Sequence, residues 1–167
     1  MSDPIRVLFI CTGNSARSQM AEALLRFMGG SDFEVFSGGT EPKGVNPYTV
    51  CVLDEICIDW SAALSKPLAG FIDQRFDYVV TVCDRARQAC PYFPGGHEML
   101  HWDLEDPAEV EGTDEEKLDA FRQTRTEIAD RLRPFVEQAR LERAGRESSL
   151  AVAARAALTE GGGAASN

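Results

Sequence analysis

The sequence predicts an α/β protein with a single three-layer domain, in which a four-stranded parallel sheet carries helices on both faces. Short apolar runs alternate along the chain with segments of helical periodicity, a pattern typical of parallel strands joined by helices. The length of 167 residues and the hydrophobic fraction of 44% suit one domain with its own core. We expect this catalytic domain over residues 1–143 and a partly helical or disordered tail over residues 144–167.

The first strand, loop and helix form the stretch around which the rest is organised. Residues 5–10 are mostly branched and apolar, as in a buried strand. Residues 19–28 repeat apolar side chains at helical spacing, so we expect a helix that begins near Arg17. The loop between them is short and polar, starts at Cys11 and carries Gly13.

Later elements follow from similar signals. Asn46 and Pro47 mark the start of a helix, because proline suits the first helical position. We expect Cys51 and Cys57 of this region to pack in the core. Further strands are expected over residues 33–36, 77–82 and 98–102, and short helices over residues 67–71 and 84–89.

A capping box marks the start of a long C-terminal helix. Thr113 is followed by Glu116 at the spacing at which each side chain can bond the other's backbone N–H. Pro134 falls within the apolar stripe of this helix, and we expect it to kink the helix or end it early. Residues 150–158 suit a helical extension, whereas the last several residues favour disorder.

Composition excludes several classes of protein. The net charge of -10 argues against nonspecific nucleic-acid binding, and a small anion must therefore be attracted by local potential. No apolar run approaches the length of a membrane span, and no signal peptide is recognisable. Five cysteines without a signal peptide predict a reducing cytoplasm and reactive thiols.

His97 and His101 have no third ligand at suitable spacing, so we expect no metal site. We expect no other cofactor.

Residues 11–18 predict a site for a tetrahedral oxyanion. A loop that runs into a helix directs several backbone N–H groups at one point, where the helix dipole adds positive potential. Arg17 adds a planar fork that grips two oxygens. The expected oxyanion-binding residues of this segment, the oxyanion loop, are Thr12, Gly13, Asn14, Ser15, Ala16, Arg17 and Ser18.

The same field favours a thiolate at Cys11, which makes this residue a nucleophile at neutral pH. Ser15 and Ser18 can donate hydrogen bonds to its sulfur, and Asn14 can brace the loop. For a cysteine considered alone, a buried structural role at a strand end is the alternative.

Three candidates converge on one edge of the sheet. Cys11 and Cys83 each follow a strand, and Asp106 lies in a loop after another, where ligands of parallel sheets bind. Attack on an oxyanion requires an acid to protonate the departing oxygen. We favour Asp106 as this acid, with Asp103 and Glu105 as alternatives. If Asp106 has no catalytic role, the Asp106-Pro107 pair is an ordinary turn.

Cys83 and Cys90 decide between functions. If the six residues between them are helical, the two sulfurs start too far apart, because a disulfide needs Cα atoms within about 7 Å. The segment would have to unwind, which a marginal helix does at low cost. Two unrelated core cysteines are the alternative.

Together these residues resemble the thioredoxin-coupled arsenate reductases, which share the fold of the low-molecular-weight protein tyrosine phosphatases. The resemblance covers about residues 4–140 and rests on residues 11–22, on Cys83-x6-Cys90-Pro91, and on His101-Trp102 ahead of Asp106-Pro107. The Cys-x5-Arg-Ser loop and the Asp-Pro pair are common to both families. Only the cysteine pair separates the two.

The resemblance implies a three-step relay. Cys11 attacks arsenate held by the loop and Arg17, while Asp106 helps water to leave. Cys83 then attacks Cys11, which releases arsenite and leaves a disulfide. Cys90 attacks Cys83 and moves the disulfide to a position where thioredoxin reduces it. The electron count agrees, because reduction of arsenate and formation of one disulfide each involve two electrons.

The resemblance also concerns the support of the loop, for which we expect Asn14, Ser18 and Ser37. Some members bind potassium there through an Asn and a Ser that match Asn14 and Ser37. Lys66 stands where an Asp of that site would fall, so we expect its ammonium to replace the cation and to pair with Glu22.

Three other functions remain open. A low-molecular-weight tyrosine phosphatase would need only Cys11, Arg17 and Asp106. A variant of the reductase would use a small thiol in place of thioredoxin. A third possibility is an oxyanion or redox sensor. For the reductase we expect a cytoplasmic monomer that binds arsenate, with phosphate or sulfate as mimics.

Overall fold

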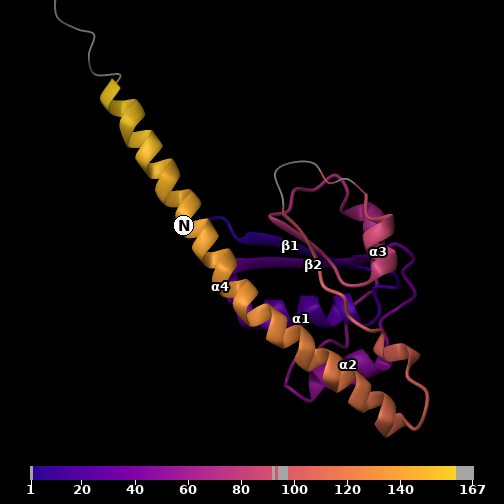
Figure 1. Ribbon diagram of the computed structural model, residues 1–167. Helices are drawn as coiled ribbons and strands as arrows, with labels where there is room; N and C mark the ends of the chain where they lie inside the picture. The colour runs from indigo at the N-terminus through magenta and orange to yellow at the C-terminus, as the bar shows by residue number, and fades with distance from the viewer. Residues whose placement is uncertain (1, 92, 94–97, 161–167) are drawn as a thin grey trace, which may run out of the picture.

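A four-stranded parallel sheet forms the centre of the protein (Figure 1). The computed structural model describes residues 2–91, 93 and 98–160. The strand order is β2-β1-β3-β4, and every neighbouring pair is parallel. The strands are β1 (Ile5–Cys11), β2 (Phe33–Gly39), β3 (Tyr78–Thr81) and β4 (Glu98–His101). The predicted fold class is confirmed.

The register brings the carboxyl ends of the strands to one edge. Cys11 pairs with Gly39 of β2, and Ile10 pairs with Thr81 of β3, which in turn pairs with His101 of β4. The loops that follow β1, β3 and β4 therefore start side by side. These loops carry the residues predicted to react.

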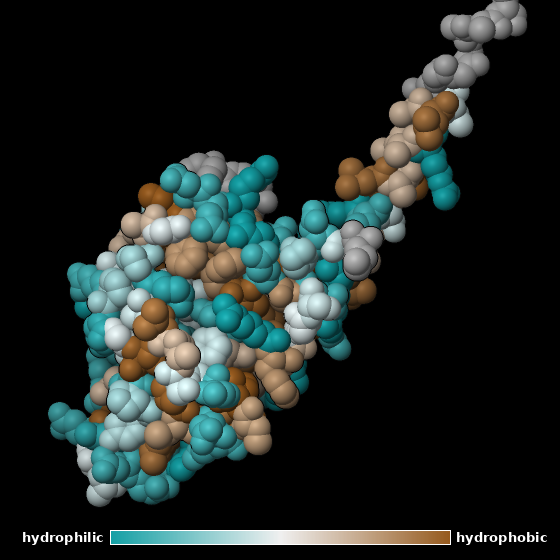
Figure 2. All heavy atoms as spheres, turned by 180° about the vertical axis from the view of Figure 1, so that it is seen from behind, coloured by the Kyte–Doolittle hydropathy of each residue, from teal (hydrophilic) through white to brown (hydrophobic). Residues whose placement is uncertain are grey.

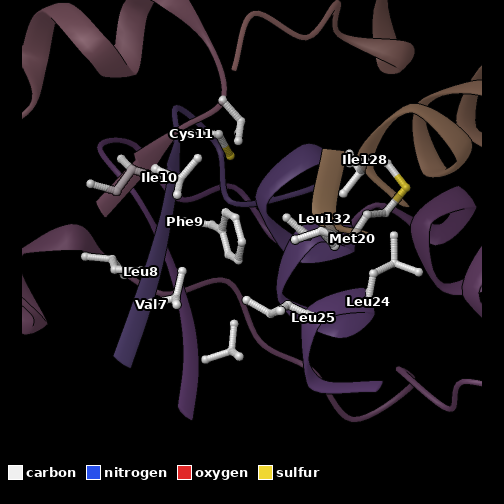
Figure 3. Close-up of a cluster of buried hydrophobic side chains, with 14 of the residues drawn as sticks. Val7, Leu8, Phe9, Ile10, Cys11, Met20, Leu24, Leu25, Ile128 and Leu132 are labelled. Carbon is white, nitrogen blue, oxygen red and sulfur yellow. The ribbon is translucent and has the colours of Figure 1, made fainter. Parts of the chain in front are cut away.

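The central strand β1 is buried on both faces. Figure 3 shows the Phe9 side chain on the side of β1 that faces Leu25 and Leu132, and Leu8 and Ile10 on the opposite side. Leu8, Phe9 and Ile10 have no exposed surface. A strand buried on both faces explains why residues 5–10 form a continuous apolar run rather than an alternating one.

Helices cover both faces of the sheet (Figure 1). The helices α1 (Arg17–Gly29), α2 (Pro47–Asp54) and α4 (Asp114–Glu160) pack together on one face, and α3 (Asp84–Ala89) lies against the other. Three short 3-10 turns complete the described elements: η1 (Gly30–Asp32), η2 (Leu68–Gly70) and η3 (Pro107–Glu109). The predicted starts of α1 and α2 and both bounds of α3 are confirmed.

The long helix α4 does not end at Pro134, and the expectation of an early end is wrong. The capping box forms, because the Glu116 N–H donates to Thr113 Oγ1 at 3.2 Å. Pro134 lies on the exposed side of the helix. Water can therefore hydrate the carbonyl that this proline leaves without an N–H donor.

Beyond the sheet, α4 projects from the rest of the molecule (Figure 1). Figure 2 shows apolar side chains exposed along this projection, and Leu150 and Leu158 are 70% and 79% exposed. Residues 150–158 are helical, as expected, whereas the expected disorder of the last residues concerns positions outside the described chain.

The expectation that Cys51 and Cys57 pack in the core is also wrong, since both are exposed. The buried side of α2 consists of Thr49, Val52 and Leu53, so Cys51 points the other way. Separately, no helix in the described ranges is both long and apolar enough to cross a bilayer.

Candidate active site

The oxyanion loop leaves the sheet at Cys11 and reaches α1 at Arg17. Asn14 adopts the left-handed backbone conformation with a φ of 46°, which asparagine tolerates better than most residues. This turn folds the loop back on itself, so that the Asn14 N–H donates to the Cys11 sulfur at 3.1 Å.

Ser18 holds the Cys11 sulfur from the first turn of α1. Its Oγ lies 2.8 Å from the sulfur and accepts a hydrogen bond from Asn14 Nδ2 at 2.8 Å. Because Asn14 is the donor in that bond, the Ser18 hydroxyl proton is free to point at Cys11, where it stabilises a thiolate. Ser15 lines the cavity instead, so Ser18 is the serine that contacts this sulfur in the described structure.

Asn14 braces the loop through a fully buried side-chain amide. Its Nδ2 donates to Ser18 and Ser37, both at 2.8 Å. Its Oδ1 accepts from Gln19 Nε2 at 2.8 Å and from the Lys66 backbone N–H at 2.9 Å. Both amide groups are thus satisfied, and the loop is tied to α1, β2 and the segment before η2.

A buried carboxylate lies behind Ser37. The Ser37 hydroxyl donates to Glu22 Oε1 at 2.7 Å, and Lys66 Nζ lies 3.4 Å from the same oxygen. Arg26 Nη2 lies 2.8 Å from the other oxygen. The Glu22 side chain is only 3% exposed, so its charge depends on these cations. The predicted pairing of Lys66 with Glu22 is confirmed.

Arg17 joins the oxyanion loop to the loop that follows β4. Its Nη1 donates to the Leu104 carbonyl at 2.9 Å, and its Nη2 lies 3.4 Å from Asp106 Oδ2. Asp106 also caps η3, where its Oδ1 accepts from the Ala108 N–H at 3.0 Å. Of the three acids considered, Asp106 is the one that contacts Arg17. Asp103 lines the same cavity, and Glu105 does not.

Cys83 and Cys90 flank α3. Cys83 is buried at the helix N-cap, where its sulfur accepts from the Ala86 N–H at 3.4 Å. The Thr12 hydroxyl of the oxyanion loop lies 3.4 Å from the same sulfur. Cys90 is half-buried just after the helix, and burial raises the pKa of its thiol. All five cysteines are free thiols here.

A cavity of about 520 Å³ opens at the carboxyl edge of the sheet. Cys11, Arg17, Cys83 and Asp106 all line it, whereas Cys90 does not. The side chains of Asn14 and Ser18 do not line the cavity and instead hold the loop through hydrogen bonds. The full set of lining residues is Cys11, Thr12, Gly13, Ser15, Ala16, Arg17, Lys43, Cys83, Asp84, Arg85, Asp103, Leu104, Asp106, Ala108 and Glu109.

Gln19 braces Asn14, a role that no local sequence pattern predicts. Its Nε2 contacts Asn14, and its Oε1 accepts from Trp60 Nε1 at 2.8 Å. The side chain is fully buried, although α1 was predicted to turn an apolar face inward. A polar glutamine among the apolar residues of this helix is the hint in the sequence that Gln19 has such a role.

The structure also brings together Asp84, His101 and Asp103, whose potential metal-binding atoms lie within 4.8 Å of one another. His101 Nε2 lies 3.2 Å from Asp84 Oδ1, and its Nδ1 lies 2.8 Å from Thr81 Oγ1. Asp84 follows β3, whereas His101 and Asp103 lie two residues apart at the end of β4, so spacing along the chain could not reveal the full set. His97 lies outside the described residues.

Known proteins resemble this chain over most of its length. The arsenate reductase of Halalkalibacterium halodurans is 45% identical over 131 residues, which make up 78% of this chain and 94% of that protein. The arsenate reductase of Bacillus subtilis is 41% identical over the same length. A solved thioredoxin-dependent arsenate reductase of Corynebacterium glutamicum superposes with a TM-score of 0.67 at 33% identity, over 85% of this chain and 65% of that one.

A second solved structure, an arsenate reductase in the oxidised state, has a TM-score of 0.69 at 28% identity and is covered over 97% of its length. Residues 6–147 match the family described as low molecular weight phosphotyrosine protein phosphatase. The Cys11–Arg17 loop, the parallel sheet and the relatives all indicate this same family. The chain therefore belongs to the low molecular weight phosphotyrosine protein phosphatase family.

Proposed function

We propose that this protein is an arsenate reductase that converts arsenate to arsenite and is re-reduced by thioredoxin. The observation that carries the proposal is the presence of a second buried thiol, Cys83, in the cavity of Cys11. A third thiol, Cys90, lies at the far end of the short helix α3. The arsenate reductases among the relatives support the same activity.

The first step is nucleophilic attack on arsenic. The Cys11 thiolate, stabilised by the Ser18 hydroxyl and the Asn14 N–H, forms a bond to the arsenic of arsenate. Arg17 and the loop N–H groups hold the remaining oxygens. Asp106 gives a proton to the departing oxygen, which leaves as water.

The second step reduces arsenic. The Cys83 thiolate attacks the Cys11 sulfur, the sulfur–arsenic bond breaks, and its electron pair stays on arsenic, which leaves as arsenite. The Thr12 hydroxyl beside the Cys83 sulfur can donate to the thiolate. The two electrons come from the two thiols, which are left as a Cys11–Cys83 disulfide.

The third step returns Cys11 to the thiol. Cys90 attacks Cys83 by thiol–disulfide exchange, which frees Cys11 and creates a Cys83–Cys90 disulfide. Six residues of α3 separate the two cysteines, so the helix has to unwind for them to meet. A helix of this length has little stability of its own. Thioredoxin then reduces the new disulfide.

Phosphatase activity on phosphotyrosine is the second candidate, because the family has the oxyanion loop and the acid in common. The cavity argues against it as the main activity, since no aromatic side chain lines the cavity within the described part of the chain. A tyrosyl ring would find charged groups such as Lys43, Asp84 and Arg85 at the walls. Phosphate ester hydrolysis also leaves the Cys83–Cys90 pair without a role.

The test is arsenate-dependent oxidation of NADPH in the presence of thioredoxin and thioredoxin reductase, with phosphate as the control anion. Sustained oxidation with arsenate alone is the expected result. Cys83→Ser and Cys90→Ser should each abolish multiple turnover, whereas Cys51→Ser and Cys57→Ser serve as controls because these thiols are exposed. Undiminished turnover of Cys90→Ser would exclude the relay, and rapid hydrolysis of a phosphotyrosine analogue without arsenate turnover would establish the phosphatase.

We propose a cytoplasmic monomer, whose catalytic domain spans residues 1–143 and whose tail follows from residue 144. A reducing compartment suits five free thiols. Sedimentation of the full chain and fractionation of cells that produce it test these two points.

A further inference from the structure

Residues 40–43 run along the oxyanion loop and are bonded to it through the backbone. The N–H groups of Thr40, Glu41 and Lys43 donate to the carbonyls of Cys11, Thr12 and Gly13 at 3.3, 2.9 and 3.1 Å respectively. The backbone of Lys43 is therefore held at a fixed position beside the loop.

The side chain of Lys43 lies across Gly13. A Cβ atom added to Gly13 would come within 2.7 Å of Lys43 Cε and 3.0 Å of its Cγ. Lys43 also lines the cavity that contains Cys11 and Arg17. The aliphatic stem thus packs on the loop that binds the oxyanion, and Gly13 leaves the room for it.

The charges around the cavity make this cation useful. Four acids line the cavity, namely Asp84, Asp103, Asp106 and Glu109, and the whole chain has a net charge of -10. An arsenate anion that approaches this surface is repelled unless a local cation compensates.

Among the described residues the cations that line the cavity are Arg17, Lys43 and Arg85. The charge of Arg17 is partly offset by the Asp106 carboxylate, which lies 3.4 Å from its Nη2. Arg85 belongs to the short helix α3, and among the described residues no backbone hydrogen bond joins α3 to the oxyanion loop, whereas the Lys43 backbone is bonded to that loop. Among the described residues no carboxylate lies within ion-pair distance of the Lys43 ammonium.

We infer that Lys43 is an oxyanion-binding residue of this site, whose ammonium contacts the incoming arsenate and supplies a second positive charge beside Arg17. The inference rests on the proposed function. The charge acts on the bound anion before and during attack by Cys11, so it stabilises the ground state and the transition state alike. Lys43 therefore governs KM and leaves kcat almost unchanged.

The experiment measures the Kd of inorganic phosphate by titration calorimetry and the KM and kcat of arsenate reduction by the full chain. Lys43→Met keeps the aliphatic stem over Gly13 and removes the charge, and it should raise both Kd and KM by about 5- to 20-fold with kcat within about twofold. Lys43→Arg should restore most of the affinity. Lys117→Met, which removes a cation of α4 that does not line the cavity, should bind phosphate like the unaltered protein.

Salt gives a second readout. The phosphate Kd of the unaltered protein should rise with NaCl more steeply than that of Lys43→Met, because one screened charge is missing in the variant. Unchanged Kd and KM in Lys43→Met would overturn the inference and leave arsenate reduction by the protein intact. A lower kcat at unchanged KM would overturn it as well. Failure of the unaltered protein to bind phosphate and to reduce arsenate would instead remove the proposed function and the inference together.

Discussion

The guanidinium of Arg17 lies 3.4 Å from the Asp106 carboxylate and 2.9 Å from the Leu104 carbonyl. One side chain of the oxyanion loop thereby positions the loop that follows β4. The proposed acid is held by the same group that is proposed to bind the oxyanion. In the proposed mechanism this contact couples attack by Cys11 to protonation of the departing oxygen.

Asp106→Asn should lower the rate of the first step by about 100- to 10,000-fold, the usual contribution of a general acid. Binding of phosphate should persist or tighten, because Arg17 keeps its place and a negative charge is lost. Arsenite release in a single turnover measures the step. Asp103→Asn is the matched control, since Asp103 lines the same cavity. A large loss in Asp103→Asn with full activity in Asp106→Asn would assign the acid to Asp103.

Gly39→Ala should damage the site from the side of β2. A Cβ atom at Gly39 would lie 2.6 Å from the Thr12 carbonyl oxygen and 2.9 Å from the Asn14 nitrogen, both backbone atoms of the oxyanion loop. We expect a loss of about 1–3 kcal/mol in the free energy of unfolding and a weaker phosphate Kd. Urea unfolding and calorimetry measure the two quantities. Gly70→Ala is the control, because nothing lies within 4 Å of its added Cβ. Equal behaviour of the two variants would contradict the prediction.

Lys66→Met should destabilise the protein by about 1–3 kcal/mol, because Arg26 is then the one cation of the described chain that still contacts the buried Glu22 carboxylate. The unaltered protein should unfold at the same urea concentration in KCl and in NaCl of equal ionic strength, since the Lys66 ammonium already neutralises Glu22. Stabilisation by potassium alone would show a cation site that Lys66 does not fill.

Cys90 should react more slowly with iodoacetamide than Cys51 and Cys57 at pH 8. Burial raises the pKa of the Cys90 thiol, whereas the other two side chains are exposed. Burial favours the neutral Cys90 thiol in the folded state. The contribution of this thiol to the free energy of unfolding is therefore fully present below the unfolded pKa of about 8.5. It is lost as the pH rises through the folded pKa. Alkylation followed by mass spectrometry should show a Cys90 rate that still climbs above pH 8.5. Equal rates for all three thiols would contradict burial of Cys90.

Truncation after Glu147 should change neither stability nor turnover. All residues from Ser148 to Thr159, in the projecting part of α4, are exposed. The match to the family ends at residue 147, so the truncation removes nothing that the family model covers. The midpoint of urea unfolding should correspond to a change within about 0.5 kcal/mol. A larger loss, or dissociation of an oligomer detected by sedimentation, would show that the projection has a partner in solution.

Local patterns of the sequence were sufficient for the backbone and for the reactive loop. The apolar run of β1, the start of α2 at Pro47 and the bounds of α3 follow from interactions between residues close in the chain. The loop from Cys11 to Ser18 is equally local, since it consists of a strand end, a tight turn and a helix start, and its role as an oxyanion site stays a prediction. The pairing of Lys66 with Glu22 was predicted only through the resemblance, and the structure confirms it.

Tertiary structure alone decided which acid meets Arg17, that Gln19 braces Asn14 and that Lys43 crosses Gly13. It also placed Cys51 on the exposed side of α2 and let α4 continue through Pro134. The physical reason is that the pattern of a segment sets its own backbone, whereas contacts between segments depend on the register of the strands and the direction of each helix. Only when the carboxyl ends of β1, β3 and β4 are aligned do the loops that follow them form one cavity.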